Sequence, residues 1–292
     1  MIGYGAWEAG GADWGPNDSE DAVIGAMHAA LESGINWIDT AEVYGDGVSE
    51  TLVGRAVSGR RDEVLLATKV GPAPEGTGFR PEEIRSACEA SLRRLRTDRI
   101  DLYQLHWPDE TGVPLEETWG AMADLIQAGK VRFAGVSNFD RPQIERCLAI
   151  RHVDTLQPEF SLLAREEQEV IRWCAEVGIG VISYSPLGAG LLTGAIAPGT
   201  TFTDWRGEAT DGFLADLEGS LATVERLRPI AERLGITLSQ LALAWNIAQP
   251  GVTAAIAGSR NAEHVRANTA AGDIELDDAT LREIDDALAN EL

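Results

Sequence analysis

Three short apolar runs of the sequence each end in an ionisable residue. Asp39, Lys69 and His106 close these runs, and Tyr44 follows Asp39 by five residues. If the runs are neighbouring parallel strands of a barrel, their carboxyl ends place an acid, an ammonium and an imidazole on one rim, with a phenol beside them. These four residues are the candidate catalytic group.

Together the four side chains could form an acid catalyst. A free phenol has a pKa of about 10 and holds its proton at neutral pH, but an adjacent ammonium stabilises the phenolate and lowers that pKa. Asp39 would hold Lys69 in place, and His106 would orient a carbonyl oxygen beside Tyr44. Such a site protonates an oxygen as negative charge develops on it. Because the group contains no strong nucleophile, the electrons must come from a hydride donor.

Lysine usage strengthens the case for Lys69. The chain has 24 basic residues, yet only Lys69 and Lys130 are lysines, and the pKa of an ammonium can move whereas that of a guanidinium cannot. Each residue also has a purely structural explanation. Lys69 and Asp39 would be a buried ion pair, His106 a satisfied core histidine, and Tyr44 an ordinary loop residue. The conjunction of all four favours catalysis.

Alternating strand-like and helical segments predict the elements that position these residues. The expected strands are Ile2–Gly5, Asn36–Asp39, Val64–Lys69, Ile100–His106, Val131–Val136, Thr155–Glu159, Gly180–Tyr184 and Thr253–Ala257. The expected helices are Ser19–Ser33, Arg80–Leu95, Pro114–Ala128, Arg141–Ile150, Glu166–Val177, Leu217–Leu234, Thr237–Gln249 and Asn261–Ala271. Eight strand–helix cycles in 292 residues match an α/β fold of the (β/α)8 TIM barrel type, as one domain over 1–292. A doubly wound sheet alternates similarly, but no glycine-rich fingerprint with a helix start follows the first strand.

Two segments fall outside this alternation. The irregular stretch 187–216 is rich in Gly, Thr and Ala, and we expect it to be a lid or cofactor-covering loop. The acidic tail 277–292 is expected to form a C-terminal helix packed outside the barrel.

Composition argues against several kinds of partner. A net charge of −23 disfavours nucleic acid and anionic membrane surfaces. The charge-free run Val177–Thr203 is interrupted by glycines and prolines, so it does not predict a membrane helix. Cys88, Cys147 and Cys174 are odd in number and widely spaced, which favours buried thiols in a reducing compartment over disulfides or a metal cluster. With no signal peptide predicted, we expect a cytoplasmic enzyme without a metal.

Six ordered segments carry a family resemblance across nearly the whole chain. They are Asn36–Gly45 (NWIDTAEVYG), Ala67–Val70 (ATKV), Asp101–Pro108 (DLYQLHWP), Gly135–Phe139 (GVSNF), Leu156–Glu159 (LQPE) and Ser183–Leu187 (SYSPL). In these segments the sequence resembles the aldo-keto reductase superfamily. The resemblance implies that Asp39, Tyr44, Lys69 and His106 are a catalytic tetrad with Tyr44 as general acid. It also implies that NADPH supplies a hydride to an aldehyde or ketone.

The same resemblance implies cofactor contacts. Ser137, Asn138 and Gln157 would hydrogen-bond the nicotinamide carboxamide, and Tyr184 would stack on the nicotinamide ring. The Ser185–Leu192 loop would cover the pyrophosphate, through Ser185, Leu187, Gly188 and Gly190. The absence of acidic residues from Val177–Thr203 supports this independently, because a dinucleotide phosphate needs exposed backbone N–H groups without carboxylates. The alternative is a glycine-rich loop that is merely flexible.

The segment Gly258–Asn268 resembles the family's adenosine phosphate site imperfectly. Ser259 lies in this segment, Arg260 could take the 2′-phosphate bidentately, and Asn268 would face the adenine. Many members have a lysine where Gly258 stands here, a basic or amide side chain at His264, and an acid at Ala267. NADP(H) is therefore the expected cofactor with NAD(H) possible, since Arg260 and Arg266 could also be solvated surface charges.

The amino end departs from the family as well. Members generally begin with a hairpin that plugs the bottom of the barrel, whereas this chain opens at the first strand, so we expect a barrel lacking that plug or a start downstream of the natural one. Its loss would affect stability more than catalysis.

The substrate is expected to be a small carbonyl or alcohol. Trp7 and Trp107 are the candidate pocket residues, and Trp14 and Trp205 could join them in an aromatic pocket for a planar, apolar or sugar-like carbonyl. All four could equally be packing residues.

Three rival functions share these residues. The chain could bind NADP(H) as a catalytically weak sensor or interaction subunit of the same fold. Lys69 could form a Schiff base in a lyase. Asp39 and Glu159 could serve a retaining glycosidase, which needs two carboxylates about 5 Å apart.

Overall fold

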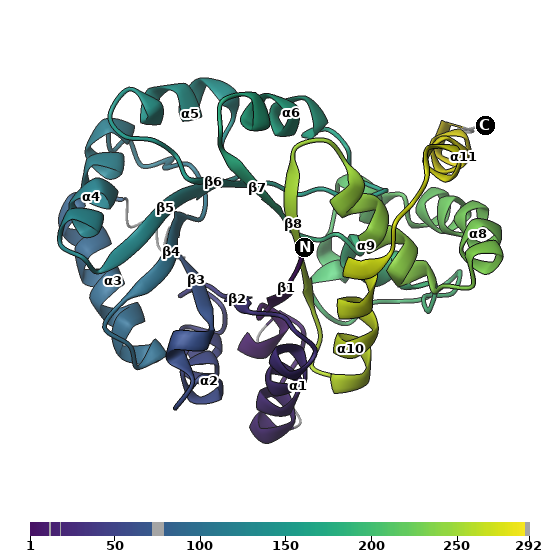
Figure 1. Cartoon of the computed structure of the whole chain (residues 1–292), viewed down its shortest axis with the longest axis horizontal. Coiled ribbons are helices and arrows are strands. Elements are labelled where there is room, and N and C mark those ends of the chain that lie inside the picture. Colours follow the sequence, from purple (N-terminus) through teal and green to yellow (C-terminus); the bar gives the residue numbers. More distant parts are fainter. Residues whose placement is uncertain (12, 18, 72–78, 290–292) are drawn as a thin grey trace.

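The computed structural model describes residues 1–292 except 12, 18, 72–78 and 290–292. Eight parallel strands close into a barrel in chain order (Figure 1). The strands are β1 (Ile2–Gly5), β2 (Trp37–Asp39), β3 (Leu65–Val70), β4 (Ile100–Leu105), β5 (Val131–Ser137), β6 (Thr155–Gln157), β7 (Gly180–Ser183) and β8 (Val252–Gly258). Pairing of β1 with β8, from Ile2↔Ala255 to Gly5↔Gly258, closes the ring. The predicted (β/α)8 barrel is thereby confirmed, and the open sheet is excluded.

Helices surround the barrel on its outside (Figure 1). They are α1 (Glu20–Glu32), α2 (Val48–Ala56), α3 (Pro81–Leu95), α4 (Leu115–Gln127), α5 (Arg141–Leu148), α6 (Gln168–Glu176), α7 (Gly212–Ala215), α8 (Leu217–Leu234), α9 (Leu238–Ala248), α10 (Ala262–Ala270) and α11 (Asp278–Ala289). Helix α2 is absent from the sequence-based expectation. It is short, it contains Gly54, and its N-cap is Gly47 in the left-handed region, so the usual side-chain cap signal is missing.

Local capping chemistry sets several helix ends. The Ser19 hydroxyl accepts from the Ala22 N–H at the start of α1. Thr237 and Gln240 form a reciprocal capping box at the start of α9. Both arrangements satisfy amide donors that the helix itself leaves free.

The stretch 187–216 is less irregular than its composition suggests. It contains a 3-10 helix at Gly188–Thr193, another at Trp205–Glu208, and the single turn of α7. The tail carries α11, which lies beside α8 at one edge of the molecule (Figure 1).

Three further sequence features can be checked against the structure. The three cysteines are buried and free. Among the residues that the structure describes, no helix is long and apolar enough to cross a membrane. The described residues also contain no group of three or more His, Cys, Asp or Glu side chains arranged to hold a metal ion.

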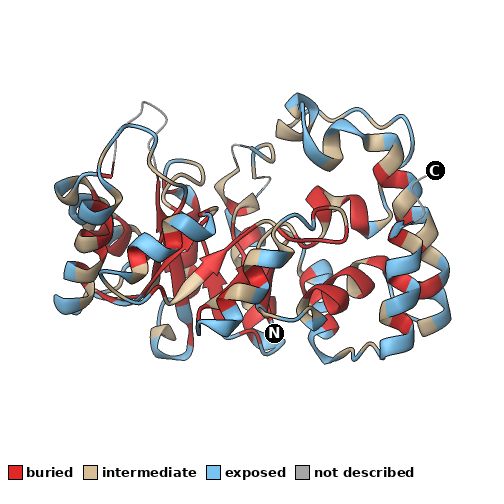
Figure 2. Ribbon diagram, turned by 90° about the horizontal axis from the view of Figure 1, so that it is seen from above, coloured by how far each residue is buried: buried red, intermediate tan, exposed pale blue. Residues whose placement is uncertain are grey.

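The core divides into a layer outside the strands and a small cluster within the barrel. Figure 2 shows burial concentrated on the strands and on the inner faces of the helices. The inner cluster consists of Trp37, Ile182, Ala254 and Ile256. The Trp37 indole lies so close to Gly3 that a Cβ at Gly3 would stand 2.1 Å from it. Gly3 is therefore the residue that makes room for a tryptophan inside the barrel.

We expect Gly3→Ala to destabilise the fold by about 1–3 kcal/mol, because the added methyl forces Trp37 out of its packed position. The matched control is Gly25→Ala in α1, where nothing lies within 4 Å of the added Cβ and the helix gains about 0.5–1 kcal/mol. Thermal and denaturant unfolding measure both changes. A Gly3→Ala protein as stable as the parent would contradict this account of the barrel interior.

Candidate active site

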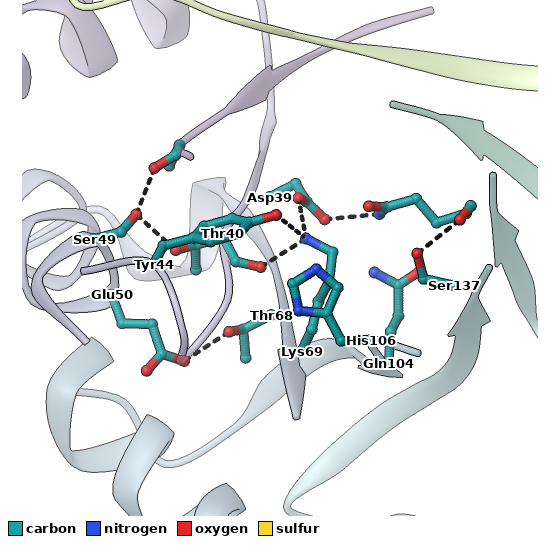
Figure 3. Close-up of polar contacts among 12 residues, drawn as sticks. Asp39, Thr40, Tyr44, Ser49, Glu50, Thr68, Lys69, Gln104, His106 and Ser137 are labelled. Atoms are coloured by element: carbon teal, nitrogen blue, oxygen red, sulfur yellow. Dashed lines mark hydrogen bonds and ion pairs between the residues drawn. The ribbon is translucent and has the colours of Figure 1, made fainter. Parts of the chain in front are cut away.

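The predicted tetrad assembles at the carboxyl ends of three adjacent strands. Asp39 ends β2, Lys69 lies one residue before the end of β3, and His106 follows β4 directly. Tyr44 comes from the loop after β2, and Figure 3 shows its hydroxyl turned toward Lys69. The register of β2 with β3 pairs Asp39 with Ala67. The barrel thus brings together side chains that are up to 67 positions apart in sequence.

Lys69 is the centre of the group. Its side chain is fully buried, and its Nζ donates to Asp39 Oδ1 (2.5 Å), the Thr40 carbonyl oxygen (3.0 Å) and the Tyr44 hydroxyl (3.3 Å). Burial by itself lowers the pKa of Lys69, but the Asp39 carboxylate and Tyr44 oppose it, and the net pKa lies above its ordinary value. All three ammonium protons have acceptors, so Lys69 is held in its charged form.

The pKa of Tyr44 corrects the sequence-based argument. Burial raises the pKa of Tyr44, the Lys69 ammonium lowers it, and the Asp39 carboxylate raises it again. The net result is a pKa above 10, because desolvation of the phenolate outweighs the nearby positive charge. The predicted lowering by Lys69 is therefore present, but burial, which the sequence-based argument did not include, outweighs it. The phenol carries its proton at neutral pH, as a proton donor must.

His106 is the neutral member of the tetrad. It is 4% exposed, and burial together with the Lys69 charge holds its pKa well below its ordinary value. Its ring stacks on Trp107 with centroids 3.8 Å apart and meets the edge of Tyr44 at 5.6 Å. Its buried Nδ1 has no hydrogen-bond partner within the described residues. A neutral imidazole in this position can orient a carbonyl oxygen beside Tyr44.

A second layer of polar contacts extends the tetrad toward β5 and β6. Gln157 Nε2 donates to the remaining Asp39 oxygen, Oδ2, over 3.0 Å, and the Ser137 hydroxyl donates to the Gln157 carbonyl over 2.7 Å. Asn138 has a left-handed φ of 61°. Its Nδ2 donates to the His106 carbonyl (3.1 Å). Residues expected to contact a nicotinamide carboxamide therefore lie beside the tetrad and brace one another.

Tyr184 completes this layer from the end of β7. Its hydroxyl donates to Asn138 Oδ1 over 3.0 Å, which ties the ring to the rim. Tyr184 and Asn138 both line the cavity, so the side chain predicted to stack on nicotinamide is already positioned there.

The tetrad opens into a cavity of about 720 Å³ that reaches the β8–α10 connection. Its lining includes most of the predicted cofactor and substrate residues: Ser137, Asn138, Gln157, Tyr184, Ser185, Leu187, Gly190, Ser259, Asn268, Trp7 and Trp107. Gly188 is buried beside this cavity but does not line it. Ser185 and Ala189 have φ values of 51°, a backbone strain typical of functional loops.

Arg260, predicted to bind the 2′-phosphate, points away from the cavity. It does not line the cavity. Its Nη2 donates to the Trp14 carbonyl (3.0 Å), and its Nη1 donates to the carbonyls of Gly15 (3.1 Å) and Pro16 (3.2 Å) and to Asn17 Oδ1 (3.2 Å). In this structure the guanidinium clamps the β1–α1 loop to the β8–α10 loop.

Several cavity residues were missed or left open by sequence reasoning. Glu8 and Asp13 line the cavity from the β1–α1 loop, and Arg206 does so from the 187–216 stretch. Trp14 and Trp205, which the sequence left as pocket or packing residues, do both, with ring centroids 5.6 Å apart. The sequence could have indicated these residues only by their position in loops that follow barrel strands, since no local motif marks them.

Arg206 contacts both the 187–216 stretch and the β1–α1 loop. It forms a bidentate pair with Asp204 (2.9 and 2.6 Å) and donates to the Ala189 carbonyl (3.1 Å). Its guanidinium also lies 4.9 Å from the ring centroid of Trp14. Arg206 thus connects the 187–216 stretch to the β1–α1 loop, and Arg260 connects the β1–α1 loop to the β8–α10 loop.

Two acidic residues, Glu50 and the partly buried Glu42, lie behind the tetrad. Glu50, which is fully buried, accepts from Thr68 Oγ1 (2.6 Å) and Arg94 Nε (2.6 Å). Glu42 accepts from the Gly71 N–H over 2.9 Å. Burial, followed by repulsion from Glu50, raises the pKa of Glu42 to about 7.

Fold and site together define a (β/α)8 oxidoreductase built around an Asp, Tyr, Lys and His group. The family model described as the Aldo/keto reductase family matches residues 1–289. The chain therefore belongs to the aldo/keto reductase family.

Named relatives agree with this membership. The chain is 40% identical over 269 residues to the aldo-keto reductase YhdN of Bacillus subtilis, covering 89% of this chain and 81% of that protein. It is similar to the glycerol dehydrogenase AKR11B4 of Gluconobacter oxydans, with a TM-score of 0.89, 34% identity, and 100% and 92% of the two chains covered. An aldo/keto reductase of Klebsiella pneumoniae in complex with NADP and acetate gives a TM-score of 0.76 at 34% identity, covering 98% and 90%.

The raised pKa of Glu42 predicts a pH-dependent stability. In the unfolded chain this carboxyl ionises near its ordinary pKa of 4.5, whereas in the folded protein it keeps its proton up to about pH 7. The folded state then binds more protons across this window, so stability falls as pH rises. Between pH 5 and pH 7.5 the free energy of unfolding of the parent should fall by roughly 2 kcal/mol because of Glu42, and the Glu42→Gln protein should not show this fall.

Urea unfolding at both pH values measures this difference. Exposed Glu110 provides the control, since Glu110→Gln should leave the pH dependence of the parent intact. If Glu42→Gln and the parent lose the same stability over this range, Glu42 is not the group responsible.

Proposed function

We propose that this protein transfers a hydride between NADP(H) and the carbonyl carbon of an aldehyde or ketone, with Tyr44 as the general acid. One observation carries the proposal. The Tyr44 hydroxyl lies 3.3 Å from the Nζ of a fully buried Lys69, at the floor of a cavity large enough for a dinucleotide and a small substrate.

The cavity lining suits a nicotinamide dinucleotide. Asn138 and Gln157 offer amide groups beside the tetrad, and Tyr184 offers a ring face. At the other end, Ser259 and Asn268 are buried polar residues that face the same space. When bound, the cofactor supplies the hydride. The NADP complex of the Klebsiella pneumoniae relative supports the choice of cofactor.

The four residues then have distinct roles. Tyr44 gives its proton to the carbonyl oxygen as negative charge develops there. Lys69 stabilises the phenolate that remains, and Asp39 keeps Lys69 charged and oriented. His106, neutral because of burial and the Lys69 charge, donates a hydrogen bond that orients the carbonyl.

The same contacts weigh against the rival functions. A Schiff-base lyase needs a neutral amine, whereas Lys69 has a raised pKa and three acceptors. A retaining glycosidase needs a free pair of carboxylates, whereas Asp39 is bonded to Lys69 and Gln157. The sensor alternative leaves the complete tetrad without a purpose.

Recognition of the 2′-phosphate requires Arg260 to change partners. Its guanidinium now serves the carbonyls of the β1–α1 loop. A phosphate is a stronger acceptor than a carbonyl, because charge-assisted hydrogen bonds are about twice as strong as neutral ones. We propose that Arg260 exchanges these carbonyls for the 2′-phosphate, which favours NADPH over NADH.

We expect Tyr44→Phe to bind NADPH as the parent does and to lose turnover by about 10²–10⁴-fold, since only the transferable proton is removed. Cofactor binding is measured by quenching of tryptophan fluorescence, and turnover by NADPH absorbance with an aldehyde. The control is Tyr103→Phe, which removes a hydroxyl from β4 that does not line the cavity. Unchanged turnover in Tyr44→Phe would refute its role as the acid.

For Arg260→Ala, we expect the KM for NADPH to rise about tenfold and that for NADH to change far less, because a charged contact to the 2′-phosphate is lost. Arg266→Ala is the matched control, because this exposed arginine lies nearby in α10 and does not line the cavity. Equal increases for both cofactors would show that Arg260 acts only by holding the loop.

A further inference from the structure

We propose that the site selects uncharged carbonyl substrates over anionic ones, and that Asp13 makes this selection. The inference rests on the proposed carbonyl reductase function and deepens it by naming the substrate class. It starts from the side chains that surround the substrate end of the cavity, where Trp7, Tyr44 and Trp107 meet.

Asp13 lies one indole ring away from the proton donor. Its Oδ2 accepts a hydrogen bond from Trp7 Nε1 over 2.7 Å, and the Trp7 ring packs 6.2 Å from the Tyr44 ring, centroid to centroid. Asp13 also lines the cavity itself. After burial and Asp39, its charge is a further cause of the raised pKa of Tyr44, as expected of a negative charge acting on that hydroxyl.

Asp13 has no ion-pair partner. Across the described part of the chain, no nitrogen of a Lys, Arg or His side chain lies within 4.0 Å of its carboxylate oxygens. The residues outside that part (12, 18, 72–78 and 290–292) include no basic residue at all. The Asp13 side chain is exposed, so solvent and an incoming substrate can reach its carboxylate.

The cationic groups closest to the tetrad are already paired or neutral. Arg206 is neutralised by its bidentate pair with Asp204, and Lys69 by its contact with Asp39. His106 is neutral because burial and the Lys69 charge lower its pKa. Asp13 is then a carboxylate that lines the cavity beside Trp7 without an ion-pair partner among the described residues.

The position of Asp13 is built into the fold. Arg260 holds the next three residues by their carbonyl oxygens, beginning with Trp14. The Trp14 indole packs edge-on against Trp7 and Trp205, with centroids 5.4 and 5.6 Å away. Asp13 thus belongs to a braced loop, and its negative charge stays at the mouth of the substrate site.

The magnitude follows from charge separation. Asp13 would repel a carboxylate on a substrate bound about 8 Å away. Near a protein surface, and after partial screening by salt, this repulsion lowers kcat/KM about tenfold. An uncharged aldehyde of the same shape escapes this penalty, and the indoles offer it apolar contact.

The test compares two aldehydes of nearly equal shape, methyl 4-formylbenzoate and 4-formylbenzoate, with the parent and the Asp13→Asn protein. The asparagine Oδ1 can still accept from Trp7 Nε1, so the substitution removes charge and preserves the hydrogen bond. For each protein, the kcat/KM for the ester is divided by that for the acid, and these ratios are then compared between proteins. The comparison cancels the electronic difference between the two aldehydes. Asp13→Glu serves as a second variant that keeps the charge.

The parent should prefer the ester, and Asp13→Asn should lower the ester-to-acid ratio about tenfold, mainly by raising kcat/KM for the acid. The ratio should also fall in the parent at about 1 M salt, where charges are screened beyond about 3 Å. Glu208→Gln removes an exposed carboxylate of the 187–216 stretch outside the cavity, and it should leave the ratio unchanged, as should Asp13→Glu.

Two outcomes would overturn the inference. If both aldehydes are reduced and Asp13→Asn leaves the ratio unchanged, Asp13 does not select substrates, although the proposed function stands. If the parent reduces neither aldehyde and no other carbonyl compound with NADPH or NADH, the proposed function fails and the substrate selection fails with it.

Discussion

A single buried ammonium organises the structure around the site. Removing the charge of Lys69 from water is costly, and the cost is offset only because Asp39, the Thr40 carbonyl and Tyr44 supply three acceptors. That requirement constrains the register of β2 against β3 and the path of the loop that carries Tyr44. Because all three N–H protons of the ammonium are already donated, Lys69 can act on the reaction only through its charge.

Burial shifts the pKa values of Tyr44 and His106 in opposite directions, because it disfavours the phenolate of one and the imidazolium of the other. Desolvation keeps Tyr44 protonated and His106 neutral, so each holds the proton its role requires. The negative net charge of the chain affects this interior less than local pairing does, since Asp39, Asp204 and Glu50 each face a cation. Asp13, which lines the cavity beside Trp7, has no ion pair with any residue that the structure describes.

Motifs at strand ends allowed much of the site to be predicted, because in a parallel barrel the chain order of the strands is also their spatial order. Asp39, Lys69 and His106 could therefore be grouped from the sequence alone. Helix α2 was missed because Gly47 offers no side-chain cap. The effect of Lys69 on the Tyr44 pKa was predicted, but the larger effect of burial was not, because desolvation depends on surroundings that no local motif describes.

The amino-acid sequence by itself determined the barrel, the strand-end residues and the family, since these follow from periodicity and from ordered local segments. The tertiary structure alone decided what the loops do. Arg260 contacts carbonyls from residues 14–16, some 245 positions away, and Asp13 meets Trp7 across a loop with no regular period. Such contacts depend on how separate loops fold over a common rim, and the spacing of residues along a chain carries no record of that geometry.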